Sequence, residues 1–400
     1  MTDARRGLDA EVAVIGLGAI GSSAAWQLAA RGVDVVGIEQ HEPGHAHGGS
    51  TGRTRLFRVA CLEHPGLAPI ARRARELWRE LEASSGQELL LETGGIMIGQ
   101  PGSRIVEGTL AAAREHGLPV ERLDAAEVAR RLPAHAALDP GDVGVWDPEA
   151  GVLRPEAAIV AAAEAARAAG ARIRTGERVL AIEPDDAGVT VRLASDELRV
   201  ARVVVAAGPW IGRLVPEVPL VPHRVVQTWF APKEGRDAGI DRLPVFIRSV
   251  PGLGGEPRWI WGHGALPGDL VKVGGEFDGP FSADDPDAID RSLAPGETDE
   301  LRDQVAATFP DLEPEPAAWT TCIMAHTPDG QFVVGAMDDD RRVVVAGGCS
   351  GHSCKHAAAL GELAAQAALG EAPTTDVAFL DPRRFAAASG PHPGPDPGGL

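Results

Sequence analysis

A glycine-rich loop near the start of the chain has residue types and a spacing suited to holding a phosphate-bearing ligand. Its sequence is Gly16-Leu17-Gly18-Ala19-Ile20-Gly21. We predict an apolar strand before it, over residues 11–15, and an alanine-rich helix after it. A second predicted strand, 33–38, ends at the acidic residue Glu39. A strand, such a loop, a helix and an acidic residue at the next strand end form the context of a dinucleotide-binding βαβ unit.

Each conserved feature of that loop type has a physical role in this sequence. Gly16 permits a tight turn, Gly18 lets backbone amides approach a pyrophosphate, and Gly21 permits close packing of the helix on the strand. The positive end of the helix dipole favours phosphate groups, and a carboxylate accepts hydrogen bonds from ribose hydroxyls. The predicted cofactor contacts are Gly16, Gly18, Ala19, Ile20, Gly21 and Glu39. The loop alone does not distinguish NAD from FAD.

Composition excludes several classes of function. The 400 residues include 38 Lys and Arg against 57 Asp and Glu, a formal net charge of −19. That balance argues against nucleic acid and anionic membranes as partners. No run reaches the ~18 apolar residues of a membrane span, and residues 1–10 lack the apolar core of a secretory leader. Four cysteines are too few for a disulfide framework, so we expect a cytoplasmic protein. The absence of tyrosine excludes a tyrosyl acid or base.

Two different sequence patterns occur along the chain, and they predict two kinds of sheet. Residues 200–206 and 343–347 are small and apolar, which is typical of strands buried on both faces. A long alanine-rich helix is predicted over 154–169. Between residues 221 and 277, alternating strands separated by Pro and Gly turns predict a second, mainly antiparallel sheet. Residues 389–400 are rich in Pro and Gly, and we expect them to be disordered.

Together with the opening loop, further segments resemble a known family. They are residues 49–58, 203–210, 271–274, Cys322 with 327–329, 347–355 and 376–385. In that order they are similar to FAD-dependent amine oxidases of the sarcosine oxidase and N-methyltryptophan oxidase type, within the D-amino-acid oxidase superfamily. The resemblance covers about residues 11–385. It implies FAD rather than NAD, and an α+β fold that joins a Rossmann-like FAD-binding domain of the glutathione-reductase type to a mainly antiparallel substrate domain.

The resemblance also implies how the chain divides between the two domains. The implied ranges are 1–90, 145–215 and 316–388 for the FAD-binding domain, and 91–144 and 216–315 for the substrate domain.

Four residues carry the chemistry that the resemblance implies. Cys322 matches the cysteine that bonds covalently to the flavin, although a free cysteine is more often a small buried hydrophobe. Lys272 matches the lysine whose ammonium stabilises the superoxide formed from dioxygen; on composition alone it would be a solvent-facing strand lysine. Arg58 and Lys355 match the pair that binds a substrate carboxylate, which favours an amino acid substrate.

The resemblance implies further cofactor contacts, for which the residues alone leave other interpretations open. These contacts are Thr54, Arg55, Val179, Gly208, Gly351, His352 and Lys355. His352 is interpreted as a polar scaffold or flavin contact rather than a base. A zinc site made of Cys349, His352, Cys354 and His356 is not predicted, because no standard ligand spacing is met. We therefore expect no metal.

The sequence departs from the family pattern in the substrate pocket. Glu276 stands where sarcosine oxidase has a histidine, and Met324 where it has a tyrosine. Cys61 and Cys354 replace bulkier aromatic residues, so we expect a roomier pocket and a substrate other than sarcosine. Glu276 either pairs with a cationic group of the substrate or is a solvated carboxylate at a strand end, and both interpretations stay open.

The predicted function is an FAD-dependent oxidase. It would oxidise the C–N bond of a secondary amino acid, N-methyl or cyclic, to an imine and reduce O2 to H2O2. We expect a monomer. Three alternatives are a flavin dehydrogenase that passes electrons to another carrier, an NAD-dependent enzyme, and a non-catalytic flavin-binding subunit.

Overall fold

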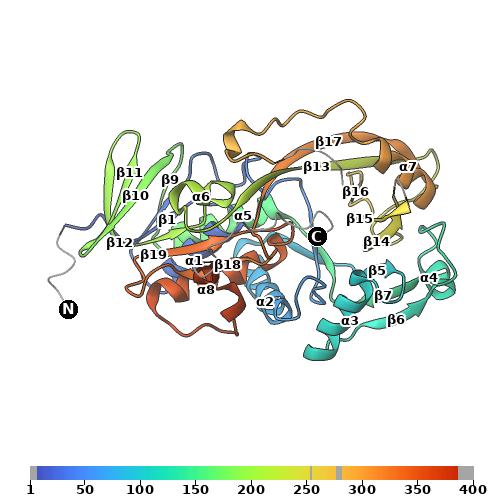
Figure 1. Ribbon diagram of the computed structural model, residues 1–400, viewed down its shortest axis with the longest axis horizontal. Helices are drawn as coiled ribbons and strands as arrows, with labels where there is room; N and C mark the ends of the chain where they lie inside the picture. Colours follow the sequence, from blue (N-terminus) through green and yellow to red (C-terminus); the bar gives the residue numbers. More distant parts are fainter. Residues whose placement is uncertain (1–6, 253–254, 276–281, 386–400) are drawn as a thin grey trace.

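The computed structural model describes residues 7–252, 255–275 and 282–385. Within these residues the chain forms two eight-stranded sheets and one three-stranded sheet (Figure 1). Glu276 and the predicted tail 389–400 lie outside the described residues. No helix within the described ranges is long and apolar enough to cross a bilayer.

The first sheet has a parallel centre built from the predicted apolar runs. Strand β1 (Ala10–Ile15) lies between β2 (Val35–Ile38) and β12 (Glu197–Val205). Beyond them lie β9 (Arg172–Arg174) next to β2 and β19 (Val343–Gly347) next to β12, again parallel. Strands β1, β2 and β19 are almost entirely buried, as expected for a sheet covered on both faces.

Antiparallel strands extend this sheet at two places. The first half of β12 pairs with β11 (Gly188–Leu193), which pairs with β10 (Val179–Asp185), and this hairpin projects at the left in Figure 1. Strand β18 (Val333–Ala336) pairs with β19. Strand β12 thus pairs with β1 along one edge. Along its other edge its first half pairs with β11 and its second half with β19.

Alanine-rich helices pack closely on one face of the first sheet. Helix α1 (Ala19–Ala30) packs against α5 (Pro155–Ala168) and α8 (Ala357–Leu369), and α2 (Leu67–Ser85) packs against α8. A Cβ added at Gly361 of α8 would lie 2.5 Å from the Cβ of Ser23 in α1. The small side chains therefore allow the two helix axes to approach closely.

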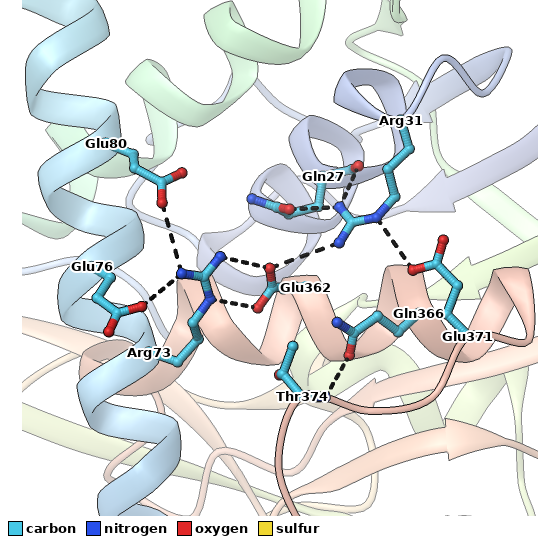
Figure 2. A network of polar contacts seen from close by, with 9 residues as sticks. All are labelled: Gln27, Arg31, Arg73, Glu76, Glu80, Glu362, Gln366, Glu371 and Thr374. Atoms are coloured by element: carbon cyan, nitrogen blue, oxygen red, sulfur yellow. Dashed lines mark hydrogen bonds and ion pairs between the residues drawn. The ribbon is translucent and has the colours of Figure 1, made fainter.

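An ion-pair network ties three of these helices together (Figure 2). Glu362 of α8 is buried, and its carboxylate accepts two hydrogen bonds of 2.9 Å from the Arg73 guanidinium of α2. Arg31, which caps the C-terminus of α1, lies 3.7 Å from the same carboxylate. A buried carboxylate requires such partners, because burial removes its hydration.

The second sheet lies toward the right in Figure 1 and is antiparallel except where β14 pairs with β5. In spatial order it contains β17 (Leu312–His326), β13 (Val221–Pro232), β16 (Val271–Gly275), β15 (Pro257–His263), β14 (Val245–Pro251), β5 (Gly95–Gly99), β7 (Val143–Asp147) and β6 (Glu121–Asp124). The predicted fold class is confirmed. Two of the expected domain boundaries, 144/145 and 315/316, fall inside strands β7 and β17.

Short elements complete the described chain. The small sheet contains β3 (Arg55–Phe57), β8 (Gly151–Leu153) and β4 (Leu90–Glu92). The remaining helices are α3 (Arg104–His116), α4 (Ala125–Arg131), α6 (Ile211–Leu214) and α7 (Asp299–Thr308). Strand β3 begins at Arg55, so pairing within the small sheet fixes the end of segment 49–58, which contains the predicted cofactor contacts Thr54 and Arg55.

Candidate active site

A cavity of about 340 Å³ opens at the N-terminus of α1 and at the ends of β1 and β2. Most of the predicted dinucleotide contacts line it, namely Gly16, Gly18, Ala19, Ile20, Glu39, Val179 and Gly208. Gly21 does not line the cavity. It lies beneath the loop, where a Cβ would come within 1.8 Å of the Gly16 carbonyl oxygen. Gly21 therefore lies where only glycine fits under the loop, whereas the cofactor contact predicted for it stays a prediction.

The loop has the features that a dinucleotide requires. Gly16 has φ +85°, and a Cβ there would lie 2.8 Å from the Ala206 carbonyl oxygen. The first turn of α1 has no acidic residue to oppose a phosphate. The Glu39 carboxylate accepts a 2.7 Å bond from the Leu17 amide. Burial alone would raise the pKa of Glu39, but His45 and the Leu17 amide hold this pKa below its usual value. Glu39 is therefore an ionised acceptor at the cavity wall.

A second cavity of about 130 Å³ adjoins the first. The two share Gly49, Cys349 and Ser353 in their walls. The predicted residues that line the second cavity are Arg55, Arg58, Lys272, Cys322, Met324, Gly351, His352 and Lys355. Residues separated by up to 300 positions in the sequence therefore meet at one place. Thr54 lies beside this cavity, and its hydroxyl bonds to His263 Nε2 at 2.8 Å.

One face of the second sheet forms the roof of this cavity. Lys272 pairs with Trp229 across β16 and β13, and Cys322 pairs with Val225 across β17 and β13. Gly274 pairs with Trp261 on β15. Because side chains alternate along a strand, Lys272 and Gly274 lie on the same face. The absence of a side chain at Gly274 makes room for the Trp261 ring, since a Cβ there would be 2.6 Å from its Nε1.

Lys272 is buried, and three oxygen atoms surround its ammonium group. Nζ donates to the Gly52 carbonyl at 2.9 Å, to the Thr54 carbonyl at 2.7 Å and to Gln227 Oε1 at 2.7 Å. Burial, reinforced by the nearby Arg55 guanidinium, lowers the pKa of Lys272 well below its usual value. This lysine therefore titrates closer to neutrality than an exposed one, while three acceptors stabilise its charged form.

Arg58 and Lys355, the predicted clamp for a substrate carboxylate, already hold a carboxylate of the protein itself. Oε1 of Glu63 accepts a 2.6 Å bond from Arg58 Nη2 and a 2.9 Å bond from Lys355 Nζ. All three side chains are buried. Burial alone would raise the pKa of Glu63, but Arg58 and Lys355 hold this pKa well below its usual value. The three groups together carry a net charge of +1, so the clamp keeps one positive charge for a ligand.

His352 presents a neutral imidazole to the cavity. Its Nδ1 bonds to the Ser350 carbonyl at 2.9 Å, so Nδ1 carries the proton and Nε2 is an acceptor. Nε2 has no hydrogen-bond partner among the described residues. Burial lowers the pKa of His352 to about 3. His352 is therefore poorly suited to remove a proton from an ammonium group near neutral pH, which agrees with its predicted role as a polar contact.

The cysteines near the cavities have distinct surroundings. Cys322 is 2% exposed, and its Sγ lies 3.9 Å from Arg55 Nη2. Cys349 Sγ accepts a 3.2 Å bond from the Ala325 amide. Burial raises the pKa of Cys61 to about 12, so that thiol stays protonated. Within the described ranges, no three His, Cys, Asp or Glu side chains are grouped so as to hold a metal ion.

Sequence reasoning missed several residues that line the second cavity. They are Glu63, Gln227, Ile247, Trp259 and Trp261. The sequence carried one further signal for this cavity, although it marks the cations of the cavity and not the missed residues. The chain has 38 basic residues but only three lysines, at positions 233, 272 and 355. Two of the three line this cavity, whereas Lys233 is exposed.

Comparisons with known proteins agree with this geometry. The family model described as FAD dependent oxidoreductase (DAO) matches residues 11–367. The chain is 34% identical to a monomeric sarcosine oxidase of Streptomyces avermitilis, over 94% of this chain and 98% of that protein. It is 30% identical to an N-methyl-L-tryptophan oxidase of Yersinia pestis, over 94% of this chain and 100% of that protein.

Solved structures show the same fold. The open form of NikD, described as an unusual amino acid oxidase essential for nikkomycin biosynthesis, superimposes with a TM-score of 0.81 at 25% identity. The match covers 93% of this chain and 97% of NikD. A glycine oxidase from Geobacillus kaustophilus superimposes with a TM-score of 0.76 at 22% identity, over 93% of this chain and 98% of that one.

The fold and site therefore define a flavoprotein oxidoreductase that acts on the C–N bonds of amines. The chain belongs to the FAD-dependent oxidoreductase (DAO) family, as the sequence resemblance implied, with relatives among the sarcosine and N-methyltryptophan oxidases.

Proposed function

We propose that this protein oxidises the C–N bond of a secondary amino acid, N-methyl or cyclic, to an imine and reduces O2 to H2O2. One observation carries the proposal: a cavity next to the dinucleotide site has Arg58 and Lys355 in its wall and a third buried cation, Lys272. Two cations suit a substrate carboxylate, and the third suits the charge that develops on oxygen. The family and the named relatives support the same class of reaction.

The residues present fit FAD. The loop from Gly16 to Gly21 with the N-terminus of α1 would hold the pyrophosphate, and Glu39 would bind the ribose. Arg55, Gly351 and His352 would contact the part of the cofactor that reaches the second cavity. FAD, when bound, supplies the two-electron acceptor for the substrate and the donor for O2. We further propose that Cys322 bonds covalently to it.

The chain's own residues orient the substrate and leave its amine free. Arg58 and Lys355 would hold the carboxylate, with Glu63 behind them. We find no general base among the described lining residues. Glu63 is ion-paired, and the low pKa of His352 makes its imidazole a poor proton acceptor. The substrate would therefore react as the neutral amine. Its lone pair would form the C=N bond as a hydrogen on the reacting carbon, N-methyl or ring, leaves with two electrons for which bound FAD would be the acceptor. The iminium would then release its N–H proton to water to give the imine, and water would hydrolyse an open-chain imine.

The walls indicate a substrate larger than sarcosine. Trp259, Trp261 and Met324 line the cavity together with Ile247, so the side chain or nitrogen substituent would pack on apolar and aromatic surface. The role of Glu276 stays a prediction, as do a monomeric state and a cytoplasmic location.

The test is anaerobic mixing of the oxidised protein with a panel of N-methyl, cyclic, D- and L-amino acids. We expect bleaching of the flavin absorbance with at least one secondary amino acid, and return of the colour with H2O2 when air is admitted. Bleaching that is reversed by an artificial dye but only slowly by air would favour the alternative, a dehydrogenase. A colourless protein, or no bleaching by any amine, would contradict the proposal and favour a non-catalytic role.

A further inference from the structure

Gln227 connects the two cations that lie beside the predicted flavin position. Its Oε1 accepts a 2.7 Å bond from Arg55 Nη1 and a 2.7 Å bond from Lys272 Nζ. Its Nε2 donates to the Thr51 carbonyl at 3.2 Å. Gln227 is 6% exposed. The neutral side chain of Gln227 in β13 thus bonds to Lys272 of β16, to Arg55 of β3 and to Thr51, which precedes β3.

These partners fix the orientation of the Gln227 amide. An amide oxygen has two lone pairs, and the two cations use both. The reverse orientation would point the NH2 group at two cations and is electrostatically excluded. Gly52 makes the approach possible, because a Cβ at this residue, whose φ is +106°, would lie 2.0 Å from Gln227 Oε1. The Gly52 carbonyl also accepts a bond from Lys272.

The charge of the linking residue matters as much as its shape. Arg55 and Lys272 are held near each other by a group that cancels neither charge. A glutamate of the same size would make the same contacts but remove one unit of positive charge from the cluster. The site therefore keeps two cations together by a neutral acceptor, at the place where reduction of O2 would develop negative charge.

We propose that Gln227 is a positioning residue that holds the Lys272 ammonium toward the cofactor cavity and sets the pH range over which it stays charged. This inference rests on the proposed function, because it concerns the cation assigned to oxygen reduction. Gln227 acts through Lys272 and Arg55 and has no assigned contact with substrate.

The first test measures the protonation of Lys272 directly and needs no turnover. Because the chain has only three lysines, a protein labelled with ¹³C and ¹⁵N in lysine gives three sets of side-chain signals. The exposed Lys233 is an internal reference. In the oxidised, flavin-loaded protein, Gln227→Glu should raise the titration midpoint of Lys272 by about one pH unit or more. Gln227→Met, which removes an acceptor without adding charge, should lower it. Midpoints unchanged in both variants would overturn the proposal.

The second test measures the rate at which chemically reduced flavin reacts with O2, which requires no substrate. At neutral pH, Gln227→Glu should slow this step roughly tenfold, while Gln87→Glu, the same charge change on an exposed residue, should not. Rates within twofold of the parent for both Gln227 variants would contradict the inference. If Lys272→Met also leaves the rate unchanged, the assignment of Lys272 in the proposed function fails instead, and the lysine titration still decides the Gln227 contact.

Discussion

The Lys355 ammonium lies 2.9 Å from Oε1 of Glu63, inside the cavity where a substrate carboxylate was expected to bind it. The same oxygen accepts the Arg58 guanidinium at 2.6 Å. The clamp is therefore a triad in which one carboxylate offsets one of two positive charges, rather than two free cations. The negative charge of Glu63 offsets the free-energy cost of burying the two cations, since unpaired buried charges are strongly destabilising. It also means that a substrate carboxylate competes with Glu63 for the same donors.

The first prediction follows from this competition. Glu63→Gln removes the competing negative charge, so the protein should bind a non-oxidisable carboxylate roughly tenfold more tightly, which corresponds to about 1.4 kcal/mol. Titration monitored by the flavin absorbance spectrum measures this affinity. The variant should also unfold at lower denaturant concentration, because two buried cations lose their partner. A matched exposed variant, Glu88→Gln, should change neither quantity. Weaker carboxylate binding in Glu63→Gln would contradict the predicted clamp.

The second prediction concerns Lys272. Replacement by Met keeps much of the side-chain volume but removes the cation that we assign to oxygen reduction. The rate at which the reduced protein reacts with O2 should fall roughly a hundredfold, while anaerobic reduction by substrate changes far less. Lys233→Met, at the exposed lysine, is the matched control and should react with O2 as the parent does. Equal oxygen reactivity in the two variants would remove Lys272 from the proposed reaction.

The third prediction is a pH dependence of the same step. Burial lowers the pKa of Lys272 well below the usual lysine value of 10.5, so its ammonium loses its proton as the pH rises through that lowered value. The rate of reaction with O2 should therefore be high at low pH and fall at alkaline pH, with a midpoint well below 10.5. Stopped-flow mixing of reduced protein with oxygenated buffer across pH measures the profile. The decrease should be absent in Lys272→Met, and a decrease that persists there must come from another group.

The fourth prediction separates Cys322 from Cys349, one of the two other cysteines that line the second cavity. If Cys322 is bonded to the flavin, acid denaturation of the parent should leave the yellow colour with the protein, and Cys322→Ser should release it. Cys349→Ser is the matched control, because Cys349 also lines the cavity, and it should keep the colour on the chain. Mass spectrometry of the intact protein gives an independent measure. A flavin that dissociates from the parent protein in acid would show that no such bond forms.

The sequence predicted most of the elements that position the site, for reasons that are local. The apolar run 200–206 includes the second half of β12, the run 343–347 is β19, and Gly16 of the glycine loop takes a positive φ that glycine adopts readily. Strand β17 was missed. Its first half contains Pro314 and Pro316, which argue against a strand in the middle of a sheet. Because β17 lies at the edge of its sheet, the prolines are tolerated.

The contacts of the site could not be read from the sequence, because they depend on how strands and loops meet. Glu63 lies in a loop without periodicity, and nothing local indicates that its carboxylate reaches Lys355. Gln227 stands in a predicted strand, but its partners follow from the register of β13 against β16 and from the loop that approaches at Gly52. Residue types suggested cations for the pocket, whereas the groups that hold those cations appear only in three dimensions.

The last prediction tests the network that supports the cofactor half of the molecule (Figure 2). Glu362 is buried between α1, α2 and α8, and Arg73 makes two bonds to it. Glu362→Gln keeps the shape but removes the charge that both arginines contact. The free energy of unfolding should therefore fall by about 2–3 kcal/mol, somewhat less than for a fully buried pair because the arginines are partly exposed. Chemical denaturation followed by far-UV circular dichroism measures this change. Glu371→Gln removes an exposed partner of Arg31 from the same network and should cost less than about 0.5 kcal/mol. Equal losses in the two variants would show that burial of Glu362 adds nothing to the attachment of α8.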